Sequence, residues 1–78
     1  MPRFFFHLYN DETARDPEGT EFPNVAAALQ FAATMARQMA AESVREGRLN
    51  LQHRVEIARE SGEIVGDVHF GDVIKIKE

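Results

Sequence analysis

Histidine is the residue type in this chain that most often serves metal binding or acid–base chemistry, and it occurs as His7, His53 and His69. No two histidines have the spacing of helical metal ligands, and neither H-x-E nor H-E-x-x-H occurs. His7 and His69 could converge near Asp67 on the open face of a sheet and form a weak metal or acid–base site. We favour ordinary strand histidines that face solvent or an interface, because a motif needs a confirming context. We therefore predict no metal and no cofactor.

Paired carboxylates, which serve acid–base catalysis elsewhere, occur in one acidic loop as Asp11/Glu12 and Asp16/Glu18. A catalytic pair needs two different environments that push the pKa values apart, and a single exposed loop gives both acids the same environment. The spacing of the acids also does not fit a calcium-binding loop. We interpret this segment as a solvated loop.

Nucleophilic catalysis has no better support in the sequence. Ser43 is expected within a helix and Ser61 in a hairpin turn, and neither has a G-x-S-x-G motif. Cysteine is absent, which excludes a disulfide, a thiolate zinc site and a cysteine nucleophile. The clustered glycines do not precede a helix, so they form no phosphate-binding loop. We predict that the chain is not an enzyme.

Composition indicates one domain over residues 1–78, with 44% hydrophobic residues, six phenylalanines and a net charge of −4. Lys and Arg form no run, and nucleic-acid binding depends on neutralising phosphates, so we expect no nucleic-acid partner. No apolar segment is long enough for a signal peptide or a membrane span, so we expect no membrane partner. The absence of cysteine fits a reducing compartment, and we predict a cytoplasmic protein.

The elements that must position these residues begin with a strand at Arg3–Tyr9, where aromatic residues favour a pleated surface. Alternation places Phe4, Phe6 and Leu8 on one face, and Phe5, His7 and Tyr9 on the other with Arg3. Asp16-Pro17-Glu18-Gly19 is typical of a β-turn. Thr20–Phe22 is interpreted as a brief strand.

A long helix is predicted over Val25–Glu46, with Asn24 as the N-cap and Gly47 as the stop. At 22 residues it should be about 33 Å long. Its apolar positions span an arc of roughly 220°, about twice the usual stripe of a surface helix. One ridge of this arc consists of Ala28, Ala32, Ala36 and Ala40.

Two further strands are predicted at Leu49–Arg59 and Ile64–Phe70, joined by a hairpin. A two- or four-residue loop pairs Val55 with Val68 and Ile57 with Gly66, which matches the apolar faces. A three-residue loop would pair Val55 with Asp67 and set the faces against each other, so we choose the former register.

The alternating segment Val73–Lys77 is interpreted as a short edge strand, because lysines on an edge discourage unwanted pairing. The rival interpretation is a single helical turn around Gly71–Ile74.

The predicted fold class is α+β, with one long helix packed on a single antiparallel sheet of three to four strands in the order β-(β)-α-β-β-(β). Apolar residues of the strands and of the helix form its core. The strands contribute Phe4, Phe6, Leu8, Val55, Ile57, Ile64, Val68 and Phe70, and the helix contributes Val25, Leu29, Ala32, Met35, Ala36 and Met39.

Two surfaces are left for binding in this arrangement. Either could form the twofold interface of a homodimer, and the alanine ridge is a candidate because it would let another backbone approach closely. The open sheet face is the second candidate binding surface, with Phe5, His7, Tyr9, Arg54 and His69. In the alternative, monomeric arrangement, the acidic loop and the C-terminal strand cover the surplus helix surface.

The function that these observations favour is a non-enzymatic protein-interaction or regulatory module, homodimeric or bound to an unidentified protein. The alternative is a small-molecule-binding domain that uses the open sheet face.

Several motifs together resemble a known family. The chain opens with Met-Pro-Arg-Phe-Phe-Phe-His, continues with Asp-Pro-Glu-Gly-Thr-Glu-Phe-Pro, and ends in a hairpin with Val68-His69-Phe70. It resembles a family of short bacterial proteins, common in rhizobia and their relatives, that is described as a domain of unknown function. Members open M-P-(R/K)-(Y/F)-(Y/F)-F and carry D-x-x-G before the helix. This chain has His69 where the family usually has Pro. The resemblance implies the fold boundaries and no site residues.

Overall fold

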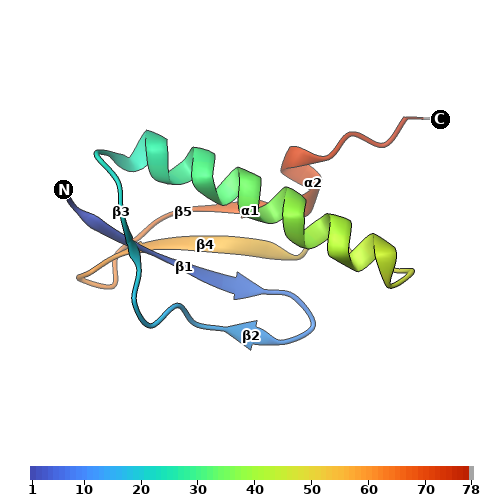
Figure 1. Cartoon of the computed structure of the whole chain (residues 1–78), viewed down its shortest axis with the longest axis horizontal. Coiled ribbons are helices and arrows are strands. Elements are labelled where there is room, and N and C mark those ends of the chain that lie inside the picture. The colour runs from blue at the N-terminus through green and yellow to red at the C-terminus, as the bar shows by residue number, and fades with distance from the viewer. Residues whose placement is uncertain (78) are drawn as a thin grey trace.

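The computed structural model describes residues 1–77. One long helix lies across one face of an antiparallel sheet, and no helix among these residues covers the other face (Figure 1). The elements follow the chain as β1 (Arg3–Tyr9), β2 (Thr13–Ala14), β3 (Thr20–Glu21), α1 (Val25–Arg45), β4 (Arg54–Arg59), β5 (Ile64–His69) and α2 (Phe70–Val73). The predicted α+β class is confirmed.

The sheet has the order β2-β1-β4-β5, and β3 pairs with β1 beside β2. The brief strand expected around Thr20 is confirmed, whereas the two-residue strand β2 was not predicted. β2 and β3 pair with opposite ends of β1, at Leu8–Tyr9 and at Arg3–Phe4. The segment between them therefore runs along the middle of this edge.

The β4–β5 hairpin has the predicted register, with Val55 opposite Val68 and Ile57 opposite Gly66. The register then shifts, so that Ala58 pairs with Ile64. The prediction of Ile64 as a core residue is wrong, because this shift places it beside Ala58 on the open face, where it is 50% exposed. Val65 packs against the core instead.

Helix α1 begins as predicted at Asn24, whose side-chain oxygen accepts a hydrogen bond from the Ala27 N–H at 2.9 Å. It ends one residue earlier than predicted, with Glu46 as the C-cap before Gly47. The four ridge alanines, Ala28, Ala32, Ala36 and Ala40, are the residues that α1 buries. Their methyl groups let the helix lie close to its own sheet. The ridge is therefore occupied within one molecule, which corrects its assignment as an interface with a second copy.

The core lies between this ridge and the sheet. Phe4, Phe6, Val55, Ile57, Val68 and Phe70 are buried in it, as predicted. Leu8, Val25, Leu29, Met35 and Met39 are only partly buried and surround it. Their incomplete burial leaves apolar surface beside α1.

The structure differs from the prediction at the start of β4 and after the end of β5. β4 begins at Arg54, five residues later than predicted, because the preceding residues form a turn. Residues 70–73 form the short helix α2, so the predicted edge strand at Val73–Lys77 is wrong and the rival helical turn is correct. The N–H groups of Phe70 and Gly71 donate to the carbonyl oxygens of His53 and Leu51, at 2.8 and 3.0 Å. These bonds turn the chain away from the sheet.

Within residues 1–77, no helix is both long enough and apolar enough to cross a membrane.

Candidate functional site

The open face of the sheet carries its predicted residues in rows that run across the three long strands. Strand pairing places six polar or aromatic residues in two adjacent rows: Tyr9–Arg54–His69 and His7–Glu56–Asp67. Phe5 lies opposite Ala58 in the next row. All five predicted binding residues of this face are thus on the same surface.

The row that contains Arg54 is held together by its own contacts. The Arg54 guanidinium carbon lies 4.3 Å from the centre of the Tyr9 ring, within the range of a cation–π contact. Arg54 Nε is 3.9 Å from the Asp67 carboxylate, and the Tyr9 hydroxyl donates to Glu56 at 3.2 Å. The Tyr9 hydroxyl is thus hydrogen-bonded, whereas Arg54 is held by the Tyr9 ring and by an ion pair that is longer than a hydrogen bond.

His7 and His69 do not form a joint site. They lie on β1 and β5, with β4 between them, and they belong to different rows. His69 Nδ1 is near the carboxylates of Asp67 and Asp72, at 3.8 and 3.5 Å. In the part of the chain that the structure describes, no three His, Asp or Glu side chains are placed to hold one metal ion.

His7 takes part in a contact that fastens the acidic loop to β1. The backbone N–H of Asp16 donates to His7 Nδ1 at 3.1 Å, and the ring is 8% exposed. The Asp16 carboxylate accepts from the Phe6 N–H at 3.2 Å. It therefore supplies a hydrogen bond to the edge of β1 that faces away from β4, in the gap between β2 and β3.

The same carboxylate also closes the turn that follows. Its other oxygen accepts from the N–H groups of Glu18 and Gly19, at 3.1 and 3.0 Å. Burial by itself raises the pKa of the Asp16 carboxyl, but the bonds from Gly19, Phe6 and Glu18 stabilise its charged form. Together with the nearby His7 they hold the pKa below its ordinary value of 3.8. Asp16 therefore has a structural role.

A shallow cavity of about 330 Å³ lies on the open face beside this contact. Phe5, Ala58 and Ile64 give it an apolar side. Its polar lining residues are His7, Arg15, Arg59, Glu56 and Glu60, and Arg59 is paired with Glu63 at 2.9 Å. Because His7 Nδ1 accepts a hydrogen bond, the neutral ring carries its proton on Nε2. This N–H has no partner within residues 1–77 and is not sealed from solvent. It is available to a ligand oxygen in the cavity.

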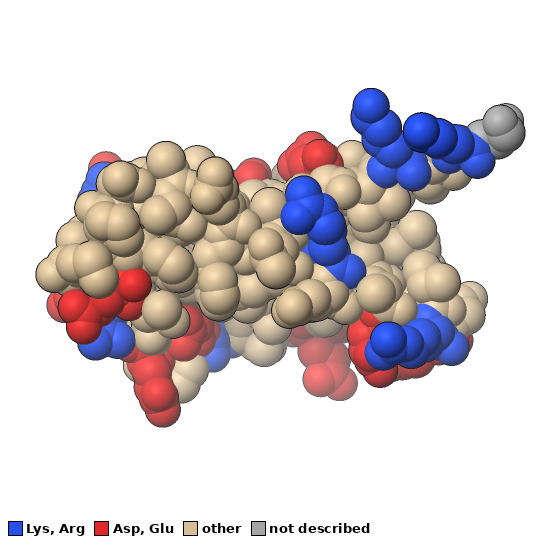
Figure 2. Space-filling model, turned by 45° about the horizontal axis from the view of Figure 1, so that its top comes forward, with Lys and Arg blue, Asp and Glu red and all other residues tan. Residues whose placement is uncertain are grey.

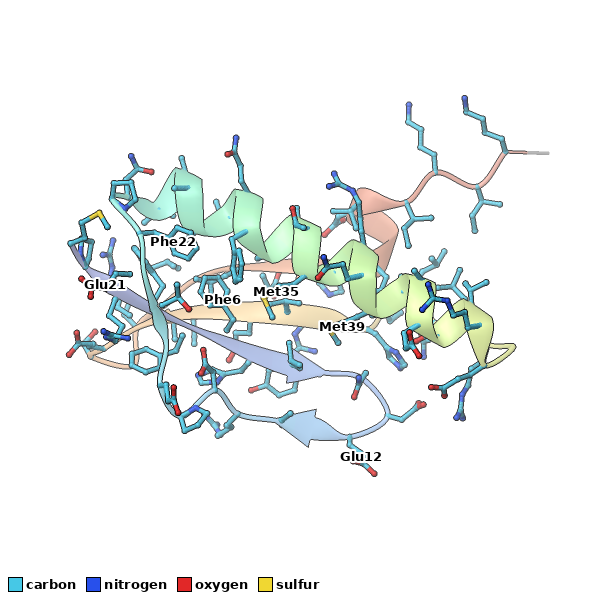
Figure 3. All side chains as sticks on the ribbon, viewed as in Figure 1. Phe6, Glu12, Glu21, Phe22, Met35 and Met39 are labelled. Atoms are coloured by element: carbon cyan, nitrogen blue, oxygen red, sulfur yellow. The ribbon has the colours of Figure 1, made fainter. Side chains whose placement is uncertain are left out.

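A larger groove lies on the other face, between α1 and β1. It consists of two cavities of about 320 and 490 Å³ that are both lined by Leu8. Phe6, Phe31 and Met35 line the first, and Met39 lies in the second. Figure 3 shows Phe6, Met35 and Met39 between α1 and β1, with Glu12 on the far side of the groove. We call this surface the α1–β1 groove.

The end of the α1–β1 groove near the end of α1 is acidic. Four acidic residues and one arginine line its larger cavity, a formal charge of −3 with His53 neutral: Asp11, Glu12, Glu42, Glu46 and Arg48. The Glu42 carboxylate is itself paired with Arg45 of the same helix at 2.7 Å. Arg48 lies 3.3 Å from Glu46 and 3.7 Å from Asp11, so one base is shared by two acids. The Glu12 carboxylate has no ion pair within residues 1–77. The acidic end therefore favours a positively charged ligand.

His53 lies in the wall of the same cavity. Its Nε2 is 3.6 Å from the Asp11 carboxylate, and its ring meets the Phe70 ring edge to face at 5.6 Å between centroids. Its Nδ1 is buried and, within residues 1–77, has no hydrogen-bond partner. Packing on Phe70 thus aims the other ring nitrogen at the acidic loop.

The sequence did not reveal the α1–β1 groove. Its residues come from β1, the acidic loop, α1 and the turn before β4, and no local pattern links these segments. One feature of the sequence did point to it: the apolar arc of α1 is wider than the sheet can cover. We assigned that surplus to the alanines, whereas the larger Phe31, Met35 and Met39 carry it.

The end of α1 also exposes apolar side chains on its other side. Val44 is 57% exposed, Leu49 38% and Ile76 65%. Val44 and Leu49, with Ala41 and Ile74, line an apolar groove of about 340 Å³. We call this surface the helix-end patch. Figure 2 shows basic side chains on the segment that follows α2, which borders this patch.

Comparison with known proteins gives a family and no further relative. No curated protein and no solved structure matches the chain. The family described as a domain of unknown function, DUF6894, matches residues 3–71, from the start of β1 into α2. Met1-Pro2 and the residues after Gly71 lie outside the match, so the opening motif and the rhizobial origin rest on the resemblance alone. The chain belongs to the family of the DUF6894 domain of unknown function.

Proposed function

We propose that this chain is a non-enzymatic protein-interaction or regulatory module that forms a homodimer in the cytoplasm. The observation that carries the proposal is the gathering of exposed apolar side chains at one end of the molecule. Val44 and Leu49 are at least 38% exposed and line one apolar groove with Ala41 and Ile74. Ile76, which is 65% exposed, follows in the segment after α2. Contiguous exposed apolar surface on a small domain is typical of an interaction site.

A second copy is the simplest partner for such a patch. Soluble oligomers are mostly homo-oligomers, and twofold dimers are the commonest of them. In a single molecule the apolar side chains of the helix-end patch remain exposed to solvent, so a second surface is needed to bury them. A twofold contact covers the helix-end patch with an identical patch.

The non-enzymatic part of the proposal is supported by how the ionisable residues are used. Asp16, whose pKa is held low, is committed to three backbone N–H groups. On the open face, the Tyr9 ring packs against Arg54 and its hydroxyl donates to Glu56. These contacts give the groups structural roles.

Sedimentation equilibrium between about 5 and 500 µM tests the homodimer. We expect the mass to approach twice 8.8 kDa at the upper end of this range. Val44→Glu should shift the chain towards monomer, because it places a charge in the patch. The matched control Ala26→Glu, on an exposed position at the other end of α1, should leave the dimer intact. A single 8.8 kDa species at every concentration would refute the proposal.

The alternative, a small-molecule site on the open face, is favoured by the free Nε2–H of His7 in its cavity. The His7 N–H and Arg15, beside Phe5 and Ile64, would receive a carboxylate that carries an apolar group. Glu56 and Glu60 line the same cavity, and Arg59 is paired with Glu63 at 2.9 Å, so Arg15 is the arginine that this site would use. Titration with benzoate, followed by amide NMR shifts, tests it. Saturable shifts at Phe5 and His7 support this site, and unchanged spectra at millimolar benzoate exclude it for this ligand class.

A further inference from the structure

The segment that follows α2 has the pattern of a strand but pairs with no strand. Ile74–Lys77 alternates isoleucine and lysine, and Ile76 is 65% exposed. Ile74 has extended dihedral angles, φ −124° and ψ 127°. In Figure 1 this segment leaves the body of the protein beyond α2. A chemically matched surface for it would be apolar at its floor and acidic at its rim.

The acidic end of the α1–β1 groove has this chemistry. Leu8 and Met39 form an apolar floor, and the surrounding residues carry the formal charge of −3 described above. Its volume of about 490 Å³ is within the range of pockets that enclose a ligand of several side-chain volumes. Met39 is an unbranched side chain that adapts to the shape of an inserted residue.

We infer that, in the homodimer, Lys75–Lys77 of each copy lies in the α1–β1 groove of the other copy, while Ile74 stays packed on its own molecule. This inference rests on the proposed homodimer and names its contact. In an extended segment alternate side chains point to opposite sides. Ile76 then meets Leu8 and Met39, while Lys75 and Lys77 face the carboxylates of the rim. Because the exchange is reciprocal, each contact occurs twice.

The groove of the same molecule is a poor site for this segment. The helix-end patch, which includes Ile74, and the α1–β1 groove lie along different sides of α1: Ala41 and Val44 line the former, and Met39, Glu42 and Ser43 the latter. Four extended residues span about 13 Å, whereas a helix with its side chains is about 10–12 Å across. To reach the groove of its own molecule, the segment would use nearly all its length to cross α1. The groove of a second copy can approach the segment directly, so the segment does not have to cross α1.

Both contact surfaces lie at the same end of the molecule. The acidic cavity contains Glu42 and Ser43 from the last turn of α1, its C-cap Glu46, and Arg48 just beyond it. Val44 and Leu49 of the helix-end patch lie in the same stretch of chain. A twofold axis near this end brings each protruding segment to the partner's groove and covers Val44 and Leu49 as well.

A charge-swap experiment tests the inference. The segment variant Lys75→Glu/Lys77→Glu and the groove variant Glu42→Lys/Glu46→Lys should each dissociate at least about tenfold more readily than the natural chain. An equimolar mixture of the two should recover a heterodimer through one restored pair of contacts. Circular dichroism checks that each variant keeps its fold. A mixture that dimerises no better than the separate variants contradicts the exchange.

Single cysteines give a second measurement, since the natural chain has none. Ile76→Cys mixed with Met39→Cys should form a disulfide-linked dimer under mild oxidation, and Ile76→Cys mixed with the exposed control Gln30→Cys should not. A chain carrying both Ile76→Cys and Met39→Cys should cross-link between copies. An internal disulfide in a monomer would overturn the inference, because the segment would then occupy its own groove.

Failure of the inference and failure of the proposed homodimer give different results. If the natural chain is monomeric throughout, both fail. If it is dimeric and Ile76→Glu leaves the dimer unchanged while Val44→Glu disrupts it, the homodimer stands and the exchange is wrong.

Discussion

The Asp16 carboxylate is the best single place to test how the acidic loop is held, and Asp16→Asn is the sharpest perturbation. The substitution keeps the size of the side chain but replaces one oxygen with an NH₂ group. One amide oxygen can still accept from Glu18 and Gly19. The oxygen that accepts from the Phe6 N–H at 3.2 Å is replaced by a donor. A donor then faces a donor in the middle of the β1 edge.

The size of the effect follows from that one lost acceptor. A partly buried backbone N–H without a partner costs about 1–3 kcal/mol. Asp16→Asn should therefore lower the free energy of unfolding by about 2 kcal/mol, and Asp16→Ala, which also removes the turn contacts, by somewhat more. A domain of this length has a total stability of about 4–12 kcal/mol. For such a domain 2 kcal/mol lowers Tm by about 8–16 °C.

Urea unfolding at pH 7, monitored by circular dichroism, measures this change. The matched control is Glu12→Gln in the same loop, which also removes one charge, and its effect should be within about 0.5 kcal/mol. Because folding lowers the pKa of Asp16, its stabilising contribution is fully present above its ordinary pKa of 3.8. The contribution is lost as the pH falls through the lower pKa of the folded state. The difference between natural chain and Asp16→Asn should therefore shrink at low pH. Equal stability of the two at pH 7 would refute this account of the loop.

Two further predictions concern backbone and packing. Gly19→Ala should destabilise the fold by about 2 kcal/mol or more in urea unfolding, because φ is +73° and the new Cβ would lie 2.8 Å from the Phe4 carbonyl oxygen. Gly62→Ala, at φ +94° with no atom within 4 Å of the new Cβ, should cost only about 1 kcal/mol, and an equal loss in both would show that contact with β1 does not matter. Ala36→Leu, at a position that is 0% exposed under the sheet, should cost about 1–3 kcal/mol or prevent folding. Ala26→Leu, on the exposed side of α1, should be nearly neutral, and thermal unfolding of this pair decides whether the ridge is filled by its own sheet.

The parts of the fold that the sequence predicted are those encoded by neighbouring residues. Asn24 and Gly47 bracket the helix because capping depends on residues within one turn. The β4–β5 register followed from matching the apolar faces of two strands joined by a short loop. The predicted open-face residues Phe5, His7 and Tyr9 alternate along one strand, and the structure places them on one surface.

The parts that escaped prediction depend on contacts between distant segments. Ile64 lies on the open face because the register shifts at the end of the hairpin, and the alternating pattern carries no sign of that shift. Asp16 looked like one of several acids in a solvated loop, yet its carboxylate fills the gap between β2 and β3. The acidic end of the α1–β1 groove needs residues 8–12, 39–48 and 53 together. No window of the sequence contains them all.

The segment after α2 shows why a clear local sequence pattern can lead to a wrong prediction of the structure. Ile74–Lys77 has the alternation of an edge strand, but a strand forms only where another backbone offers hydrogen bonds. The N–H groups of Phe70 and Gly71 donate to His53 and Leu51 and direct the chain away from β5 before that alternation begins. The preference for extended structure therefore remains in the segment while its partner is missing from the same molecule. In the proposed homodimer, the α1–β1 groove of the second copy, with its apolar floor and acidic rim, would supply the environment for which the alternating isoleucines and lysines are suited.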